Sequence, residues 1–333
     1  MPPPGGLVLP GESAFGATLS TAGVYGRQTM ADQPSILVCG ATGALGLRIV
    51  RGLVESGIQT RALVRPQSDA AALQALGVEL VRGDLRDPQS VQHAVAGVAT
   101  IVSTANSIGR RFAGERDLDM RAVDDEGYAA LIDAAEKAAV GRFVYLSLGG
   151  PALLVNSPFT NAKRATEARL RRSPMHEVIV RPDAFEELWF SSAVNFDPAA
   201  GKVMIFGRGL SRVSYVGMDD VAAAVVGLAT AADPQRVVEL GGPEAITRIE
   251  AAEAFANAMG RPVKRRHIPR RALVIGSLVL RRAKPELASS MAMGMAMDSA
   301  DSGLGPEAFA ELGIQPKSVR TYIAEVGPTL TGA

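Results

Sequence analysis

Three glycines stand three residues apart, at Gly40, Gly43 and Gly46, directly after an apolar run that ends at Cys39. The first position suits a tight turn, the second lets the main chain approach a ligand without a Cβ in the way, and the third lets a helix pack closely on the preceding strand. The N-terminus of that helix would offer free N–H groups and a positive dipole end to a pyrophosphate. This spacing predicts a dinucleotide-binding turn. The residues expected to contact the dinucleotide there are Gly40, Thr42, Gly43, Ala44, Leu45 and Gly46.

Arg65 follows the next apolar run, at the place where an acidic residue would accept a hydrogen bond from the ribose 2′-hydroxyl of NAD. Because a guanidinium can pair with a 2′-phosphate, we expect NADP(H) to be favoured and NAD(H) to bind less well. The alternative is a solvated arginine at the end of a strand. Asp84 closes the third run and is expected to hydrogen-bond the adenine amino group; alternatively, it merely precedes a helix that Asp87 already caps.

Other residue types that bind metals or act as nucleophiles form no constellation. His93, His176 and His267 are dispersed and Cys39 is the single cysteine, so no metal site is predicted. Neither a G-x-S-x-G elbow nor a Walker lysine occurs, which excludes α/β-hydrolase and P-loop chemistry. Four methionines alternate with small residues over 291–297. Thioethers can hold Cu(I), but without His or Cys nearby we favour an adaptable apolar wall of the substrate pocket.

The elements that would position these residues are short apolar runs alternating with helical stretches of period 3.6. Near-continuous apolar strands separated by amphipathic helices predict an α/β fold, a doubly wound parallel sheet (Rossmann fold) with helices on both faces. The expected strands are Ile36 to Cys39, Thr60 to Val64, Glu79 to Val81, Thr100 to Val102, Arg142 to Leu146 and Glu177 to Val180.

The chain has 333 residues, 47% hydrophobic and 21% charged, which excludes a disordered or disulfide-built protein and allows a large core. Residues 1–34 are rich in Pro and Gly without periodicity, so we expect a disordered leader, with Met30 as a candidate natural start. We expect the NAD(P)-binding core at 35–185. In residues 186–330 the alternation of apolar runs and helical stretches is less regular, and a capping box spans Thr247 to Glu250. We expect these residues to form a mixed C-terminal region with a smaller substrate lobe.

Thirty-five Lys and Arg balance 34 Asp and Glu, so the net charge of +1 creates no global attraction to nucleic acid or to an anionic membrane. The longest uncharged apolar run, Ala272 to Leu280, is too short for a membrane span, and no integral membrane association is expected. Basic residues flank this run. A segment that lies on an anionic membrane is one interpretation, and a solvated helix flank is the commoner one. The lone thiol in a strand fits a reducing cytoplasm, which is the expected location.

Several further motifs occur in a definite order along the chain. They are Gly83 to Asp87, Phe143 to Ser147, Val180 to Phe185, Asp220 to Ala222, Leu240 to Pro243 and Gly313 to Pro316. With the glycine-rich turn, they resemble the atypical short-chain dehydrogenase/reductase superfamily, in particular its NmrA-like and isoflavone-reductase-like branch. The resemblance covers about Ser35 to about Val326, nearly everything except the leader.

The resemblance implies which residues are catalytic. Active relatives carry a Ser at the end of the fifth strand, a Tyr that protonates the carbonyl oxygen, and a Lys four residues later that holds the nicotinamide ribose. Ser147 and Lys163 match, but Phe159 stands at the Tyr position and has no proton to give. In isoflavone-reductase-like relatives a lysine at this position acts as acid/base without Tyr, so Ser147 and Lys163 are the expected catalytic residues. The resemblance also places Leu85 and Pro182 at the cofactor.

Other interpretations of these residues stay open. Lys163 could be an exposed cation paired with Glu167 one helical turn later. Other groups could supply a proton in place of Phe159, although each could equally be buried structure or solvated surface. These groups are Tyr145, Asp183, Glu186 and Glu187.

Two functions from different classes follow. The first is an NADPH-dependent reductase of a small carbonyl, quinone or enone substrate. The second is a non-catalytic regulator like the NmrA proteins, which reads the NADPH/NADP ratio and binds a protein partner. Phe159 favours the regulator, whereas Lys163 and Ser147 favour the reductase.

Overall fold

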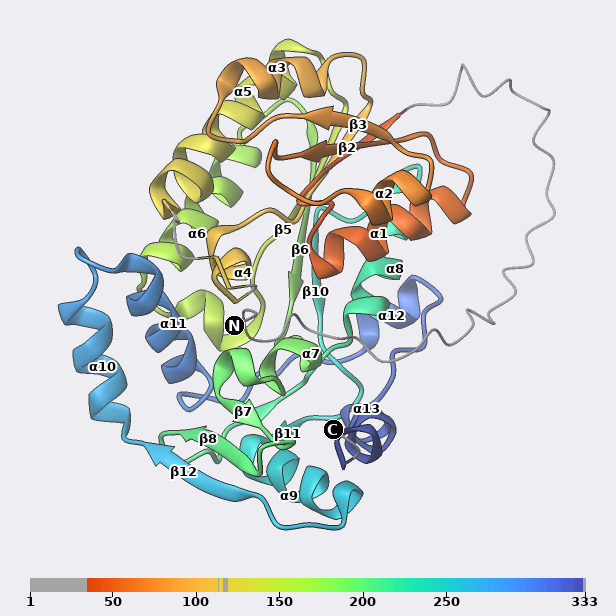
Figure 1. Ribbon diagram of the computed structural model, residues 1–333. Coiled ribbons are helices and arrows are strands. Elements are labelled where there is room, and N and C mark those ends of the chain that lie inside the picture. The colour runs from red at the N-terminus through yellow and green to blue at the C-terminus, as the bar shows by residue number, and fades with distance from the viewer. Residues whose placement is uncertain (1–34, 113, 116–118, 332–333) are drawn as a thin grey trace.

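A seven-stranded sheet forms the centre of the computed structural model, which describes residues 35–112, 114–115 and 119–331 (Figure 1). Every pair of neighbouring strands in this sheet is parallel, so the expected Rossmann fold is confirmed. The leader expected at 1–34 lies outside the described residues. The strands are β1 (Ile36–Cys39), β2 (Thr60–Val64), β3 (Glu79–Arg82), β4 (Thr100–Ser103), β5 (Arg142–Leu146), β6 (His176–Pro182) and β10 (Val237–Leu240).

The order of the strands creates a switch point in the middle of the sheet. The order is β10-β6-β5-β4-β1-β2-β3, so the chain winds outward from β1 in one direction and from β4 in the other. In open α/β sheets, ligands bind beyond the carboxyl ends of the strands at such a point. Gly40 and Thr104 are the first residues after the two central strands.

Helices cover both faces of the sheet. Ile36 and Val38 of β1 pack with α1 and α8 on one face, while Leu37 and Cys39 pack with α3 and α5 on the other. Because successive strand residues point to opposite faces, burial on both sides explains why the strands are apolar throughout. The covering helices are α1 (Ala44–Glu55), α2 (Ala71–Ala75), α8 (Met218–Thr230) and α12 (Glu307–Glu311) on the first face, and α3 (Pro88–Val95), α5 (Tyr128–Lys137) and α6 (Pro158–Leu170) on the second.

A smaller region lies below the main sheet in Figure 1. A three-stranded sheet of order β12-β8-β7 and the pair β11-β9 surround an aromatic core that includes Phe196, Tyr215 and Phe255. α10 and α11 pack against each other at the outer edge. The elements are β7 (Phe196–Asp197), β8 (Lys202–Phe206), β9 (Arg212–Val213), β11 (Ile246–Thr247), β12 (Lys264–Ile268), α7 (Glu186–Trp189), α9 (Arg248–Met259), α10 (Arg270–Val279), α11 (Pro285–Ala296) and α13 (Val319–Val326).

Residues from both sides of position 185 build the main sheet, because β10 and α8 come from the later part of the chain. The capping box expected at the start of α9 is confirmed, since Thr247 Oγ1 accepts from the Glu250 N–H and the Glu250 carboxylate accepts from the Thr247 N–H. Within the described ranges, no helix is both long and apolar enough to cross a membrane.

Candidate functional site

The residues predicted to bind or react follow successive strands of the parallel sheet. Arg65 comes after β2, Asp84 follows close behind β3, Ser147 comes after β5 and Pro182 is the last residue of β6. Because the carboxyl ends of parallel strands share one edge, the fold brings these residues to the edge that also carries the glycine-rich turn.

The glycine-rich turn joins β1 to α1 at the switch point. Gly40 has φ +90°, and an added Cβ there would lie 2.7 Å from Thr104 Oγ1. An added Cβ at Gly46 would overlap the carbonyl oxygen of Gly40, so α1 approaches β1 this closely only with glycine at 46. Gly43 is the N-cap residue of α1, and no side chain caps the first N–H groups of the helix. The turn therefore has the free N–H groups and close backbone approach that a pyrophosphate requires.

The first residues of the turn are exposed and the later ones are buried. Thr42, Gly43 and Ala44 are exposed, whereas Leu45 and Gly46 are buried. Leu45 packs into the core between the sheet and its helices. The main chain of the three exposed residues is therefore accessible to a ligand, while Leu45 serves to fix α1 in place.

Arg65 forms a bidentate ion pair with Glu115, with N–O distances of 2.6 and 2.9 Å. Arg110, from α4 (Ser107–Phe112), donates to the same carboxylate at 2.6 Å. Hydrogen bonds from Arg65 outweigh burial and, with help from Arg110, lower the pKa of Glu115 to about 2. Two guanidiniums thus share one carboxylate, and the cluster keeps a net positive charge beside β2. Arg110 and Glu115 were missed because no local pattern links them to Arg65.

Asp84 pairs with Arg86 at 2.8 Å and accepts a hydrogen bond from the Arg86 N–H. Burial acts to raise the pKa of Asp84, but the hydrogen bonds and charge of Arg86 outweigh it and lower the pKa. The expected cap of α3 is confirmed, because Asp87 accepts from the Gln89 N–H at 3.0 Å. Leu85 is buried in the core on the α3 and α5 face.

Lys163 is buried, with 3% of its surface exposed, and its Nζ donates to the carbonyl oxygen of Leu146 at 2.7 Å. Nζ also lies 4.6 Å from the ring centre of Tyr145 and 5.5 Å from that of Phe159. Burial lowers the pKa of Lys163 to about 8, against the opposing charges of Asp124 and Glu167. The alternative of an exposed cation is therefore wrong. An ammonium has three N–H groups, so two remain for other acceptors.

Phe159 lies one turn before Lys163 on α6 and faces an apolar surrounding. It clusters with buried Ile108 and Met120 and with half-buried Phe112 and Leu148. The cluster therefore places hydrocarbon beside the Lys163 ammonium.

Asp124 is a buried carboxyl near Lys163 that the sequence analysis missed. It lies in η2, a π-helical segment (Arg121–Gly127) that leads into α5, and accepts from the Ser107 N–H at 3.1 Å. Burial raises the pKa of Asp124, against the hydrogen bond from Ser107 and the charge of Lys163. Short π-helical segments are frequent at functional sites. An acidic residue on a helix gives no local sign of burial, so only the tertiary structure identifies it.

Ser147 donates its hydroxyl proton to Glu167 at 2.5 Å. Glu167 also accepts two hydrogen bonds from Arg181, at 2.6 and 3.1 Å, and one from Arg171. Ser147 thus belongs to a buried network that joins β5, α6 and β6. Pro182, the last residue of β6, is buried, and its carbonyl oxygen accepts from the Gly149 N–H at 2.8 Å.

Burial raises the pKa of two of the alternative proton donors, Tyr145 and Asp183. Tyr145 is fully buried, and burial, together with the nearby Tyr128, raises the pKa of Tyr145 well above its ordinary range. Asp183 accepts from the Ala184 N–H and the Ser214 N–H, and from the Ser302 hydroxyl. Burial raises the pKa of Asp183 against these hydrogen bonds. Asp183 therefore ties the end of β6 to the loop that follows α11.

Glu186 and Glu187 start α7 and are both largely buried. Burial, reinforced by the charges of Glu187 and Asp220, raises the pKa of Glu186 to about 9. Burial also raises the pKa of Glu187 to about 7, although the Met218 N–H donates to its carboxylate at 2.7 Å. One carboxylate oxygen of each glutamate has no hydrogen-bond partner among the described residues. These are the unpaired buried acids next to α1 and α8.

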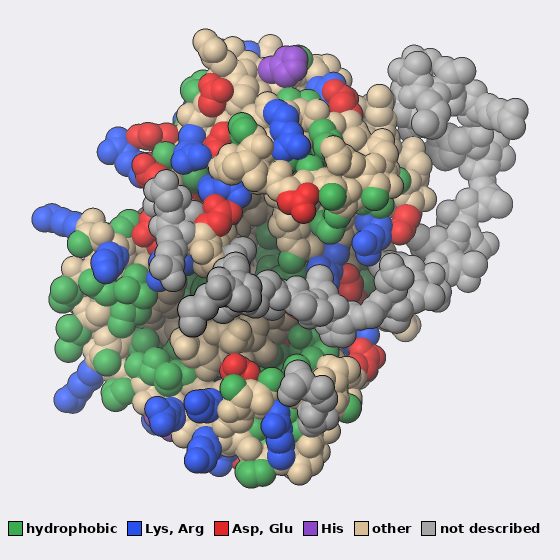
Figure 2. Space-filling model, in the orientation of Figure 1, with side chains coloured by type: hydrophobic (Ala, Val, Ile, Leu, Met, Phe, Trp, Pro, Cys, Tyr) green, Lys and Arg blue, Asp and Glu red, His purple; other side chains and the backbone are tan. Residues whose placement is uncertain are grey.

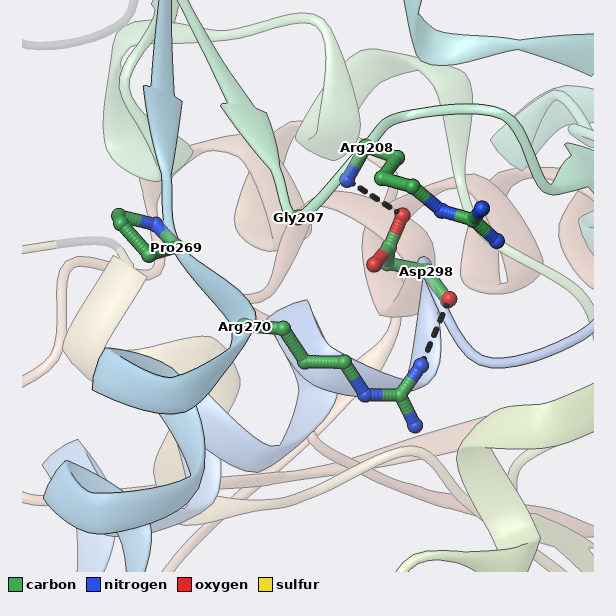
Figure 3. Close-up of a pocket in the computed structure, with 5 residues that line it drawn as sticks. All are labelled: Gly207, Arg208, Pro269, Arg270 and Asp298. Carbon is green, nitrogen blue, oxygen red and sulfur yellow. Dashed lines mark hydrogen bonds between the residues drawn. The ribbon is translucent and has the colours of Figure 1, made fainter.

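The methionines lie on α11, where residues two apart fall on different helix faces. Met293 and Met297 pack on the C-terminal aromatic core, while Met295 packs beside Val155. Within the described residues, no cluster of His, Cys, Asp and Glu fits a metal ion. A separate cavity of about 450 Å³ lies at the end of α11, lined by Gly207, Arg208, Pro269, Arg270 and Asp298 (Figure 3). None of the residues predicted for cofactor binding or catalysis lines it.

Comparisons with known proteins agree with this geometry. A family model described as NAD(P)H-binding matches residues 40–234, more than half of the chain. The chain belongs to this NAD(P)H-binding family. The expected cofactor, a nicotinamide dinucleotide, is thereby confirmed. The fold is also that of a solved isoflavone reductase, which has a TM-score of 0.65 at 20% identity and agrees with the predicted resemblance.

Relatives of this NAD(P)H-binding protein have diverse names. An NAD(P)H azoreductase from Xenophilus azovorans is 32% identical over 232 residues, which are 69% of this chain and 75% of that protein. The photosystem II assembly factor Ycf39 from Cyanophora paradoxa is 36% identical over 147 residues, 44% of either protein. The chain thus spans less than half the length of this factor and of the Ycf39 of Trieres chinensis.

Solved structures share the fold. An NADPH-dependent quinone oxidoreductase from Escherichia coli in complex with NADPH has a TM-score of 0.68 at 21% identity, covering 87% of this chain and 99% of that one. A triphenylmethane reductase from Citrobacter in complex with NADP(H) has a TM-score of 0.67 at 19% identity, covering 88% and 99%.

Proposed function

We propose that this protein is an NADPH-dependent reductase of a small carbonyl, quinone or enone substrate. The observation that carries the proposal is the buried Lys163, which lies at the carboxyl edge of the sheet and whose pKa of about 8 suits proton transfer near neutral pH. The membership of an NAD(P)H-binding family supports the hydride donor, and the azoreductase relative supports reduction as the reaction class.

The residues at the sheet edge fit NADPH. The N–H of the exposed Ala44 would hold the pyrophosphate at the positive end of α1, whereas the Gly43 N–H already donates to the Gly40 carbonyl oxygen at 3.0 Å. Arg65 and Arg110 would hold the 2′-phosphate, in exchange for part of their pairing with Glu115. Asp84 would accept from the adenine amino group, and Leu85 and Pro182 would border the cofactor.

Lys163 would supply the proton. When bound, NADPH supplies the hydride that reduces the substrate. The ammonium of Lys163 keeps one N–H on the Leu146 carbonyl, which fixes its position, and has two N–H groups free for the nicotinamide ribose and the substrate oxygen. Asp124 would hold the positive charge of Lys163 in place, and Ser147 would position the end of β5 through its hydrogen bond to Glu167.

The test is a turnover assay with NADPH and a panel of quinones and enones, following the loss of nicotinamide absorbance. We expect turnover that Lys163→Met abolishes while NADPH binding, measured by calorimetry, persists. Lys137→Met, which removes an exposed lysine from α5, is the matched control and should retain full activity.

Phe159 supports a second function, the NADPH/NADP-sensing regulator with a protein partner. Its side chain has no proton to give at the position where the resemblance expects Tyr, and its ring centre lies 5.5 Å from Lys163 Nζ. Tight NADPH binding without turnover of any substrate in the panel would favour this regulator and contradict the reductase.

A further inference from the structure

Helix α10 lies at the outer edge of the molecule (Figure 1), and six of its ten residues are exposed. Leu273 is its single buried residue. Among the described residues six large hydrophobic side chains are exposed, and three of them belong to α10: Ile275 at 60%, Leu278 at 63% and Val279 at 73%. Half of the exposed large hydrophobic side chains therefore gather on one short helix.

The three exposed side chains form one stripe. Ile275, Leu278 and Val279 are spaced three and four residues apart, so they share a face of the helix, here called the α10 stripe. Arg271 precedes Ile275 by four residues on the helix, and Arg282 lies in the turn three residues after the helix ends. A cation therefore stands close in sequence to each end of the stripe. The helix thus has an apolar face with basic ends.

The surroundings of the stripe carry charge of a single sign. Residues 261–284 contain nine Lys and Arg and no Asp or Glu, although the whole chain is nearly neutral. Figure 2 shows hydrophobic side chains over the α10 and α11 edge with Lys and Arg around them. Several of these cations make no ion pair among the described residues and are free for an external partner: Lys264, Arg266, Arg271, Arg282 and Lys284.

The cavity in Figure 3 lies at the start of the same helix. The side chains of Arg208 and Arg270 line it, and both residues are exposed. One oxygen of the Asp298 carboxylate, Oδ1, accepts from the Arg208 and Gly209 N–H groups at 2.9 Å each. The cavity therefore adds two cations, near the apolar stripe, that an anionic group could reach.

These features fit a flat anionic surface better than a second protein. A stable protein interface buries about 800 Å² on each partner, and three aliphatic side chains on one helix edge cannot supply that area. A ten-residue helix is about 15 Å long, too short to cross a bilayer but long enough to lie in its interface. An apolar stripe with basic flanks is the pattern by which helices bind anionic lipids.

We propose that the α10 stripe and its basic surround dock this protein onto an anionic lipid bilayer, with Ile275, Leu278 and Val279 in the acyl boundary and Arg271 and Arg282 at the phosphates. The proposal does not depend on the reductase function, because none of the residues proposed to bind the cofactor lies on α10.

The experiment is co-sedimentation of the full chain with vesicles of phosphatidylcholine alone and of phosphatidylcholine with phosphatidylglycerol. We expect binding to the anionic vesicles alone, and weaker binding as the salt concentration rises. Leu278→Asp with Val279→Asp, and separately Arg271→Glu with Arg282→Glu, should each lower the partition coefficient about tenfold or more. NADPH binding by each variant serves as the check that it has folded.

The controls change the same residue types elsewhere. Val237→Asp alters an exposed hydrophobic residue of β10, and Arg51→Glu with Arg172→Glu removes two exposed arginines; both should bind vesicles as the unchanged chain does. Equal binding to neutral vesicles, or equal losses in the controls and the α10 variants, would overturn the proposal. So would a dimer in sedimentation velocity that Leu278→Asp dissociates, because the stripe would then bind a second copy.

Discussion

The unusual residue of the site is a buried lysine, Lys163, which has Phe159 one helical turn before it. Lys163 sits among Tyr145, Tyr128 and Phe159, with one hydrogen bond to Leu146 and a buried carboxyl, Asp124, close by. Desolvation penalises the charged amine, whereas the rings and the carboxyl favour it. As a result, Lys163 is protonated at neutral pH and loses its proton at about pH 8.

This balance predicts a pH dependence for turnover. Lys163 holds its proton below about pH 8 and loses it above, because burial lowers its pKa to about 8. If Lys163 donates the proton, kcat/KM should be level below that pH and fall about tenfold per pH unit above it. Stopped-flow or steady-state assays across the range measure this directly. Asp124→Asn removes a stabilising charge and should shift the fall to lower pH; an unshifted profile would show that Asp124 does not act on Lys163.

The second prediction at this scale concerns Arg65. Arg65→Gln removes one of the two guanidiniums that would hold the 2′-phosphate, whereas NADH has no such phosphate. We expect the Kd for NADPH to rise about 10- to 100-fold and the Kd for NADH to stay nearly constant. Calorimetric titrations of both dinucleotides measure the difference. Equal weakening of the two would mean that Arg65 acts on the fold and not on the phosphate.

Removing the charge of Glu115 is expected to have the opposite effect on NADPH affinity. Glu115 competes with the cofactor phosphate for Arg65 and Arg110, and its low pKa keeps it ionised throughout the working range. Glu115→Gln should therefore tighten NADPH binding, with little effect on NADH, in the same titrations. Weaker binding of NADPH would show instead that Glu115 is needed to orient the two arginines.

At the scale of the elements, the turn between β1 and α1 depends on the contact between Gly46 and Gly40. Gly46→Ala would push α1 away from β1, because the new Cβ overlaps the Gly40 carbonyl oxygen. We expect the variant to lose about 1–3 kcal/mol of stability and most of its NADPH affinity. Gly227→Ala on α8 meets open space and should instead stabilise by about 0.5–1 kcal/mol. Chemical denaturation of both variants checks the contrast, and similar losses would contradict it.

The elements of the main sheet were predictable because each has a local cause. Burial on both faces makes β1 apolar along its whole length, and glycine spacing marks the turn that follows. The start of α6 is equally local, since Ser157 caps it and Pro158 is its first residue. By contrast, the π-helical segment with Asp124 and the pairing of Glu115 with Arg65 depend on contacts between distant parts of the chain. No short pattern can encode them.

At the scale of the whole molecule, α7 links the NAD(P)H-binding sheet to the C-terminal region through buried acids. Glu186 lies close to Asp220 at the start of α8, because a Cβ added at Gly217 would contact both carboxylates. The charge of Lys317, from the segment before α13, also acts on Glu186. One oxygen of Glu186 has no partner among the described residues, which is tolerable only if the carboxyl is protonated. The junction between the two regions therefore contains a carboxyl group, that of Glu186, which is neutral at neutral pH.

This preference makes stability depend on pH in an unusual direction. Burial raises the pKa of Glu186 to about 9, so between the ordinary glutamate pKa and pH 9 the native state keeps a proton that the unfolded chain has released. The free energy of unfolding must therefore decrease as the pH rises through this window, and it keeps its full value only at pH values below the window. Glu186→Gln keeps a neutral side chain of the same shape without the titration. At pH 8 it should therefore be more stable than the unchanged chain by about 5 kcal/mol, and at pH 4 no more stable. Denaturation at a series of pH values measures this, with the exposed Glu136→Gln as control; parallel curves for the unchanged chain and the Glu186 variant would show that the junction carries a charged carboxylate after all.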